Sequence, residues 1–135
     1  MAYAGDLTPQ QAWDLLAADE RAVLVDVRTA AEWTYVGVPE LAALGRETAL
    51  IEWVTFPGGA RNPQFVEQVR QVVPEGAPVV FLCRSGVRSV AAAEAVTAAG
   101  LTAYNVLEGF EGGLDDVLHR GVGGWKATGL PWRQS

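Results

Sequence analysis

Cysteine and histidine are nearly absent from this chain of 135 residues, which contains one of each, Cys83 and His119. A single cysteine excludes an intramolecular disulfide, and one cysteine with one histidine gives no cluster with the spacing of a zinc site. We expect no metal ion and no cofactor. A lone reactive thiol also fits the reducing environment of the cytoplasm, which is the localisation that we expect.

Positive charge and long apolar runs are scarce as well. Ten basic residues stand against sixteen acidic ones, and the net charge of −6, without any basic stripe, argues against nucleic-acid binding. No apolar stretch approaches the roughly 20 residues of a membrane span. The first residues lack the basic region and apolar core of a signal peptide. We therefore expect neither nucleic acid nor a membrane as a partner, and the oligomeric state stays open.

Apolar residues make up half of the chain, which is enough for the core of one domain over residues 1–135. Short apolar runs that read as buried strands alternate with stretches of helical spacing. The predicted strands are 23–27, 51–54, 79–82 and 103–107, and the predicted helices are 9–18, 29–33, 65–73 and 89–99. Thr8 and Gln11 predict a capping box at the start of the first helix. This alternation predicts an α/β fold with a central, mostly parallel sheet and helices on both faces.

Cys83 stands at a strand end, between the apolar run 78–82 and the helix-like stretch 89–99. It opens a short polar loop that consists of Cys83, Arg84, Ser85, Gly86, Val87 and Arg88. Ligands of open α/β sheets bind at the carboxyl ends of the strands. The N–H groups of such a loop, the following helix N-terminus and the two arginines all favour a negatively charged sulfur. We therefore predict that Cys83 is a nucleophile rather than only a small buried apolar residue.

The loop residues around Cys83 are candidates for binding the sulfur or its donor. Arg84 and Arg88 could hold an anionic donor, and the alternative is that they are surface arginines at a helix start. Gly86 permits a backbone angle that turns an N–H group inward. Ser85 and Ser89 can donate hydrogen bonds from their hydroxyl groups to the sulfur or to the donor, and Ser89 could instead cap the helix.

Other polar and aromatic residues are predicted to be structural. Asp26 and Arg28 lie at the end of another predicted strand, where we expect a buried ion pair or a loop brace. His119 lies among glycines, and we expect it to be exposed or packed rather than to act as a base. The five tryptophans are expected to pack in the core or in a lid; they are Trp13, Trp33, Trp53, Trp125 and Trp132.

Four stretches of the chain form a set of ordered motifs. They are Val-Asp-Val-Arg at 25–28 with Glu-Trp at 32–33, Val-Val-Phe-Leu-Cys-Arg-Ser-Gly-Val-Arg-Ser at 79–89, Asn-Val-Leu-Glu-Gly-Phe at 105–110, and Gly-Trp-Lys-Ala-Thr-Gly-Leu-Pro at 124–131. In content and order they resemble the single-domain rhodanese-like sulfurtransferases. The resemblance covers nearly the whole chain, and the cysteine loop is its most specific part.

The resemblance implies a mechanism in which Cys83 carries sulfur. Its thiolate takes the outer sulfur of a donor such as thiosulfate and becomes a persulfide, which the N–H groups of the loop hold. The persulfide then passes its sulfur to a thiophilic acceptor, which is cyanide in the laboratory and a thiol or protein thiol in the cell. By the same resemblance the substrate-binding residues are those at 84–89.

The chain departs from the family pattern in two places. The family often has Gly-His-Ile-Pro-Gly-Ala after the Glu-Trp motif, whereas residues 37–41 read Gly-Val-Pro-Glu-Leu and lack the histidine. The glycine-rich stretch at about 108–125 is longer than the plain pattern. We expect this stretch to be an extended loop that borders the Cys83 pocket and selects acceptors, because long loops beside a site usually gate it.

Two other functions stay open. A cysteine phosphatase or arsenate reductase uses a similar loop between strand and helix, but five residues separate its cysteine and arginine around a tetrahedral oxyanion. Four residues separate Cys83 from Arg88, and the smaller ring suits a sulfur atom better. The remaining alternative is a rhodanese-like module that binds or senses without turnover, against which the presence of Cys83 argues.

Overall fold

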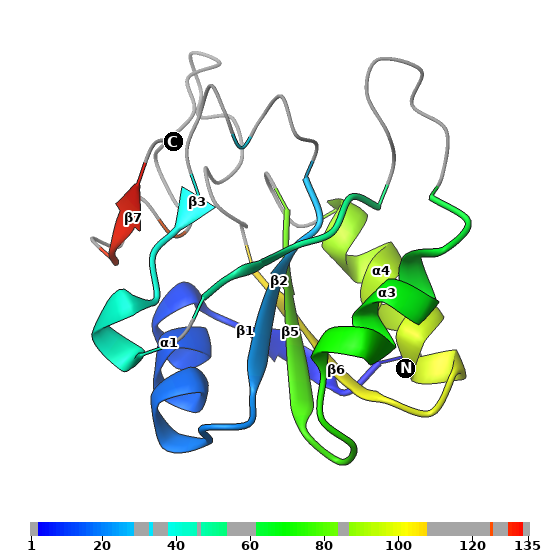
Figure 1. Ribbon diagram of the computed structural model, residues 1–135, viewed down its shortest axis with the longest axis horizontal. Helices are drawn as coiled ribbons and strands as arrows, with labels where there is room; N and C mark the ends of the chain where they lie inside the picture. Colours follow the sequence, from blue (N-terminus) through cyan, green and yellow to red (C-terminus); the bar gives the residue numbers. More distant parts are fainter. Residues whose placement is uncertain are drawn as a thin grey trace.

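A parallel sheet of five strands forms the centre of the protein (Figure 1). The computed structural model describes residues 3–28, 33, 38–45, 47–53, 62–83, 87–107, 125 and 130–133, with the backbone alone at Val87 and Arg133. The strands are β1 (Gly5–Leu7), β2 (Val23–Asp26), β4 (Ala49–Leu50), β5 (Pro78–Leu82) and β6 (Thr102–Val106). Their order across the sheet is β1-β6-β5-β2-β4, and each neighbouring pair is parallel.

Helices cover both faces of this sheet (Figure 1). Helix α1 (Pro9–Ala18) packs on one face, and helices α3 (Phe65–Val72) and α4 (Val87–Ala98) pack on the other. A 3₁₀ turn, η1 (Ala42–Leu44), and a two-stranded antiparallel sheet of β3 (Val38–Pro39) and β7 (Trp132–Arg133) complete the described elements. The α/β fold with a mostly parallel sheet, predicted from the sequence, is therefore confirmed.

Strand β5 explains why an uninterrupted apolar run precedes Cys83. It lies between β2 and β6, and Val79 and Phe81 face the α3/α4 layer while Val80 and Leu82 face the α1 layer. All four side chains are fully buried. A strand that is covered on both faces needs apolar residues at every position, so its sequence shows no alternation.

The start of α1 follows the prediction closely. The Thr8 side chain accepts a hydrogen bond from the Gln11 N–H at 3.1 Å, and the Gln11 side chain accepts one from the Thr8 N–H at 2.9 Å. Pro9 occupies the first helical turn, where its missing N–H group costs nothing. Helix α1 ends at Ala18, as predicted.

Several element boundaries differ from the sequence prediction. The predicted strand 51–54 is wrong, because β4 is Ala49–Leu50. The chain after β4 still follows β2: the Ile51 N–H group donates to the carbonyl of Asp26, and the Trp53 N–H group donates to the carbonyl of Val27. Strand β1 was not predicted, because Gly5–Leu7 is too short to show a period. For the same reason the two-residue strands β3 and β7 were missed. Of the predicted helix 29–33 the structure describes only Trp33, which is helical.

Helix α4 begins at Val87, two residues earlier than the sequence predicted, and ends at Ala98. Gly100 follows with a φ of +98°, which suits glycine at the end of a helix. The shift at the start places Arg88 and Ser89 inside the first helical turn. The interpretation of Ser89 as the cap of this helix is therefore wrong, and its hydroxyl is available for a contact elsewhere.

The topology places Cys83 at a switch point of the sheet. From β5 the chain crosses to β6 on one side, whereas from β2 it continues to β4 on the other side. The carboxyl ends of β2 and β5 therefore lie side by side with diverging connections, at the top of the sheet in Figure 1. Such a position is where open α/β folds bind ligands.

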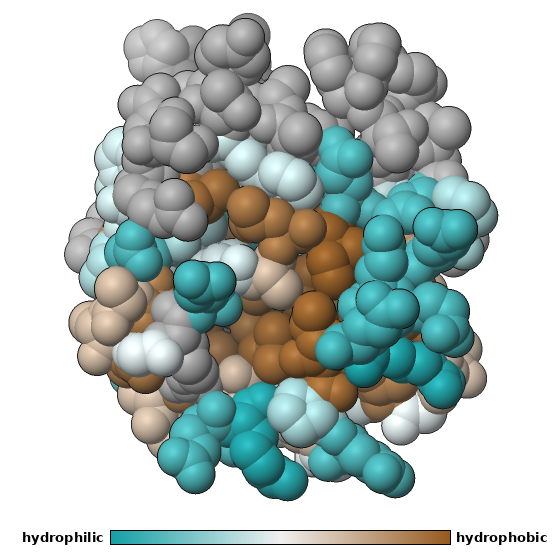
Figure 2. Space-filling view, viewed as in Figure 1, coloured by the Kyte–Doolittle hydropathy of each residue, from teal (hydrophilic) through white to brown (hydrophobic). Residues whose placement is uncertain are grey.

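Figure 2 shows apolar side chains gathered at the centre of the face in view. A cleft at the other end of the sheet is lined in part by Leu24, Leu41, Ala49 and Val72. Its other lining residues come from the start of β2 and from the segments that lead into β2, β4 and β5. The cleft is thus at the amino ends of these strands and is separate from Cys83.

The capping box gives a first test of the fold. Replacing Thr8 by alanine removes the side-chain acceptor for the Gln11 N–H group, so we expect the free energy of unfolding in urea to fall by about 1 kcal/mol. The variant Thr8→Ser keeps the hydroxyl and should lose much less. Equal stability of the alanine variant and the parent protein would show that the cap contributes nothing.

Candidate active site

Cys83 directly follows β5 and is buried, with 1% of its surface exposed. It belongs to the apolar layer between the sheet and helices α3 and α4, on the same side as Val79 and Phe81. Its Sγ atom lies 3.3 Å from the Oγ atom of Ser89. The sulfur therefore lies between the end of the central strand and the first turn of α4, as the sequence predicted.

Ser89 links Cys83 to the neighbouring strand β6. The serine is fully buried in the first turn of α4, and its hydroxyl donates to Oδ1 of Asn105 at 2.5 Å. Asn105 is itself 98% buried and pairs in register with Phe81 of β5. Because Cys83 lies two residues beyond Phe81, the amide of Asn105 reaches the same face of the sheet as the sulfur.

The polar row continues to the edge strand β1. Asn105 Nδ2 donates to Oδ1 of Asp6 at 3.0 Å, and Asp6 pairs in register with Asn105. The Tyr3 hydroxyl donates to the same carboxylate oxygen at 2.7 Å. This hydrogen bond raises the pKa of the Tyr3 phenol above its ordinary value, with further contributions from burial and from the negative charges of Asp6 and Glu94.

Sequence reasoning did not identify Asn105, Asp6 and Tyr3 as neighbours of the site. A weak signal was present, because Asn105 is a polar residue within the predicted strand 103–107, and a buried amide needs partners. The partner could not be found, since the strand that carries Asp6 has only three residues.

The other predicted site residues are described in part. Arg88 is the second residue of α4 and is partly exposed, and Val87 opens that helix. Arg84, Ser85 and Gly86 lie outside the described residues, as do His119 and the segment 108–124. The predicted roles of these residues therefore stay predictions.

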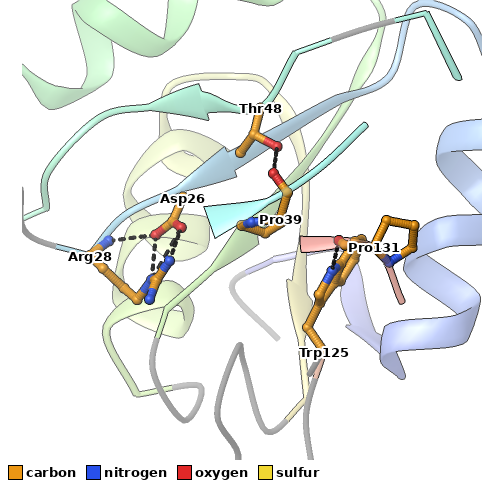
Figure 3. Close-up of polar contacts among 6 residues, drawn as sticks. All are labelled: Asp26, Arg28, Pro39, Thr48, Trp125 and Pro131. Carbon is orange, nitrogen blue, oxygen red and sulfur yellow. Dashed lines mark hydrogen bonds and ion pairs between the residues drawn. The ribbon is translucent and has the colours of Figure 1, made fainter. Parts of the chain in front are cut away.

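Asp26 and Arg28 form the predicted buried ion pair at the end of β2 (Figure 3). Both side chains are fully buried, and Nη2 of Arg28 lies 2.6 Å from Oδ2 of Asp26. Arg28 Nε donates to both carboxylate oxygens, and the Arg28 N–H group donates to Oδ1. Between the two residues, the Val27 N–H group donates to the carbonyl of Leu82, the residue before Cys83. The pair thus braces the strand end beside the cysteine.

The tryptophans divide between the core and the surface. Trp125 is fully buried, donates from Nε1 to the carbonyl of Pro131 at 2.8 Å (Figure 3), and packs edge-to-face on Trp13. Trp53 makes a similar contact with Phe65. Their predicted packing role is confirmed, whereas Trp132 is 42% exposed and does not belong to the core. Trp132 lies on β7, which pairs with the short strand β3 and not with a described strand of the central sheet.

These features define an α/β protein with a buried cysteine at the switch point of its sheet. A family model described as a rhodanese-like domain matches residues 8–116. The chain therefore belongs to the rhodanese-like family, as its motifs indicated.

Relatives of the chain agree with this assignment. An uncharacterized protein of Rickettsia conorii, RC0915, is 37% identical over 126 residues, which are 91% of this chain and 92% of that protein. The crystal structure of Rv0390 from M. tuberculosis is 58% identical and has a TM-score of 0.92, with 98% of this chain and 99% of that chain covered. Neither description states an activity.

More distant structures share the fold alone. The polysulfide-sulfur transferase homodimer of Wolinella succinogenes is 20% identical with a TM-score of 0.63, over 99% of this chain and 80% of that chain. The protein RPA3614 of Rhodopseudomonas palustris, described as a possible tyrosine phosphatase, is 22% identical with a TM-score of 0.61, over 96% of this chain and 84% of that chain.

Within the part of the chain that the structure describes, no helix is long and apolar enough to cross a membrane.

The ion pair beside the site generates a stability prediction. Replacing Arg28 by methionine leaves the carboxylate of Asp26 buried without its cation, so the free energy of unfolding should fall by about 3–5 kcal/mol. The matched control is Arg21→Met, which removes the cation of a surface ion pair: Nε of Arg21 lies 3.7 Å from Oδ1 of Asp19. Its loss should be about 1 kcal/mol or less. Similar losses for the two variants in urea unfolding would contradict the bracing role of the buried pair.

Proposed function

We propose that this protein is a sulfurtransferase that carries sulfane sulfur on Cys83. The observation that supports this most directly is the position of the only cysteine: it lies at the carboxyl end of the central strand, against the first turn of α4. Membership of the rhodanese-like family supports the same reaction class. We treat residues 1–135 as a single domain of this kind.

The proposed first half-reaction loads sulfur onto Cys83. The thiolate attacks the outer sulfur of a donor such as thiosulfate, a new S–S bond forms, and the sulfur–sulfur bond of the donor breaks. Sulfite leaves with the bonding electron pair, and Cys83 becomes a persulfide anion. In the second half-reaction a thiophilic acceptor attacks the outer sulfur of the persulfide and the Cys83 thiolate is regenerated.

The chain's own residues supply the electrostatics of this cycle. The amino end of a helix carries partial positive charge, and α4 begins four residues after the cysteine. We assign the N–H groups of 84–88 to the outer sulfur of the persulfide and the Arg88 guanidinium to the anionic donor. The segment 109–124 is proposed to border the pocket and to select between small thiols and protein thiols as acceptors.

The role of Cys83 is tested by turnover. Cys83→Ser removes the only thiol of the chain, so we expect transfer of sulfur from thiosulfate to cyanide to disappear while the circular dichroism spectrum stays that of the parent protein. Serine is close in size to cysteine and keeps the buried site filled. Retention of thiosulfate:cyanide turnover by the serine variant would exclude the proposed mechanism.

The role of Arg88 is tested by comparing donors. A hydrogen bond to a charged group is worth about 1.5–3 kcal/mol, so Arg88→Ala should lower kcat/KM for thiosulfate by about 10- to 150-fold. The loss should shrink with a neutral donor, because the guanidinium then has no anion to bind. The control is Arg70→Ala: Arg70 donates to the carbonyl of Ala99, at the opposite end of α4. Equal losses with charged and neutral donors would instead indicate collapse of the loop.

Two assays separate the alternatives. A cysteine phosphatase would hydrolyse p-nitrophenyl phosphate through Cys83 and would show no transfer from thiosulfate. A binding module without turnover would accept sulfur on Cys83, if at all, without releasing it to cyanide. We expect sulfur transfer and no phosphatase activity.

A further inference from the structure

We propose that Asp6, acting through Asn105, turns the Ser89 hydroxyl so that its oxygen lone pair, and not its proton, faces the sulfur of Cys83. Asp6 and Asn105 are then positioning residues for the cysteine, which they do not touch. The inference rests on the proposed function only in treating Cys83 as the reacting group.

The direction of the hydrogen bonds follows from the chemistry of each group. A carboxylate accepts hydrogen bonds and donates none, so the side of Asn105 that meets Asp6 must be its NH₂ group. The carbonyl oxygen of Asn105 then faces Ser89 and needs a donor. Ser89 has a single hydroxyl proton, and the contact of 2.5 Å with Asn105 Oδ1 uses it. Only lone pairs of Ser89 Oγ are left for the sulfur at 3.3 Å.

The surroundings preserve this direction. Ser89 is fully buried and Asn105 is 2% exposed, so bulk water does not compete for the hydroxyl or the amide. Asp6 is exposed at its edge strand, but its carboxylate also accepts from the Tyr3 hydroxyl. The raised pKa of Tyr3 keeps that phenol a donor. Two donors thus converge on Oδ1 of Asp6 and hold the carboxylate against Asn105.

The consequence concerns the sulfur-free state of Cys83. A protonated thiol can donate its S–H to Ser89 Oγ, whereas a thiolate at the same place meets an oxygen lone pair. For the serine to donate to a thiolate, its hydroxyl must turn and leave Asn105 Oδ1 without a donor, and a buried unsatisfied acceptor is costly. Asp6 therefore restrains the reactivity of the resting cysteine from a distance of three hydrogen bonds.

The test uses Asp6→Asn, which removes the charge and keeps the size of the side chain. The new amide can donate to Asn105, so Asn105 can turn its NH₂ group toward Ser89 and the serine proton can turn toward the sulfur. We expect alkylation of Cys83 by iodoacetamide to be about 2- to 4-fold faster in the pH range where its rate still rises with pH. A hydrogen bond from Ser89 favours the thiolate, and the lower nucleophilicity of a hydrogen-bonded thiolate offsets part of this gain.

Three further variants make the result specific. Asp14→Asn makes the same charge change on the exposed side of α1 and should leave the rate unchanged. Asp6→Ala, which also frees Asn105 to turn, should give a rise like that of Asp6→Asn. In a Ser89→Ala background the effect of Asp6→Asn should vanish, because the hydroxyl that transmits it is absent.

Two outcomes would overturn the inference. One is an unchanged alkylation rate in both Asp6 variants. The other is a rise that persists in the Ser89→Ala background, since this would mean that the substitution merely loosens the packing around Cys83. Alkylation requires neither a sulfur donor nor an acceptor, so the inference and the proposed sulfur transfer can each fail without the other.

Discussion

The burial of β5 on both faces is the constraint on which the site depends. The side chains at the end of this strand, between β2, β6 and the helix layers, are buried, so each polar group among them needs a hydrogen-bond partner. Two sets of partners meet this need. Arg28 and Asp26 neutralise each other at the end of β2, and Ser89 and Asn105 connect Cys83 to β6 and β1. Cys83 is thereby held in a largely apolar setting.

A sulfur carrier has to meet two requirements. The sulfur of Cys83 has to be available to a donor, and before it is loaded it has to be protected from other reagents. In the proposed mechanism, the N-terminus of α4 and Arg88 favour the thiolate. The direction of the hydrogen bonds from Asp6 through Asn105 to Ser89 disfavours the thiolate of Cys83 before sulfur is loaded. On this account the balance between them sets how reactive the resting cysteine is.

The sequence predicted the parts of the structure that have a local signal. The apolar run before Cys83, the capping box of α1 and the spacing of Phe65 and Val69 all follow from neighbouring residues, and so did the ion pair of residues 26 and 28. Strands of two or three residues carry no period, so β1, β3 and β7 were missed and β4 was misplaced. The contact of Asp6 with Asn105 depends on sheet register across 99 residues, which no local pattern encodes.

The central claim is that Cys83 carries the transferred sulfur, and the intact mass of the protein tests it most directly. After incubation with thiosulfate and removal of the excess, the account predicts a gain equal to the mass of one sulfur atom. Cyanide should remove this gain, and Cys83→Ser should never acquire it. An unchanged mass of the parent protein, or a gain of sulfur by the serine variant, would contradict the account.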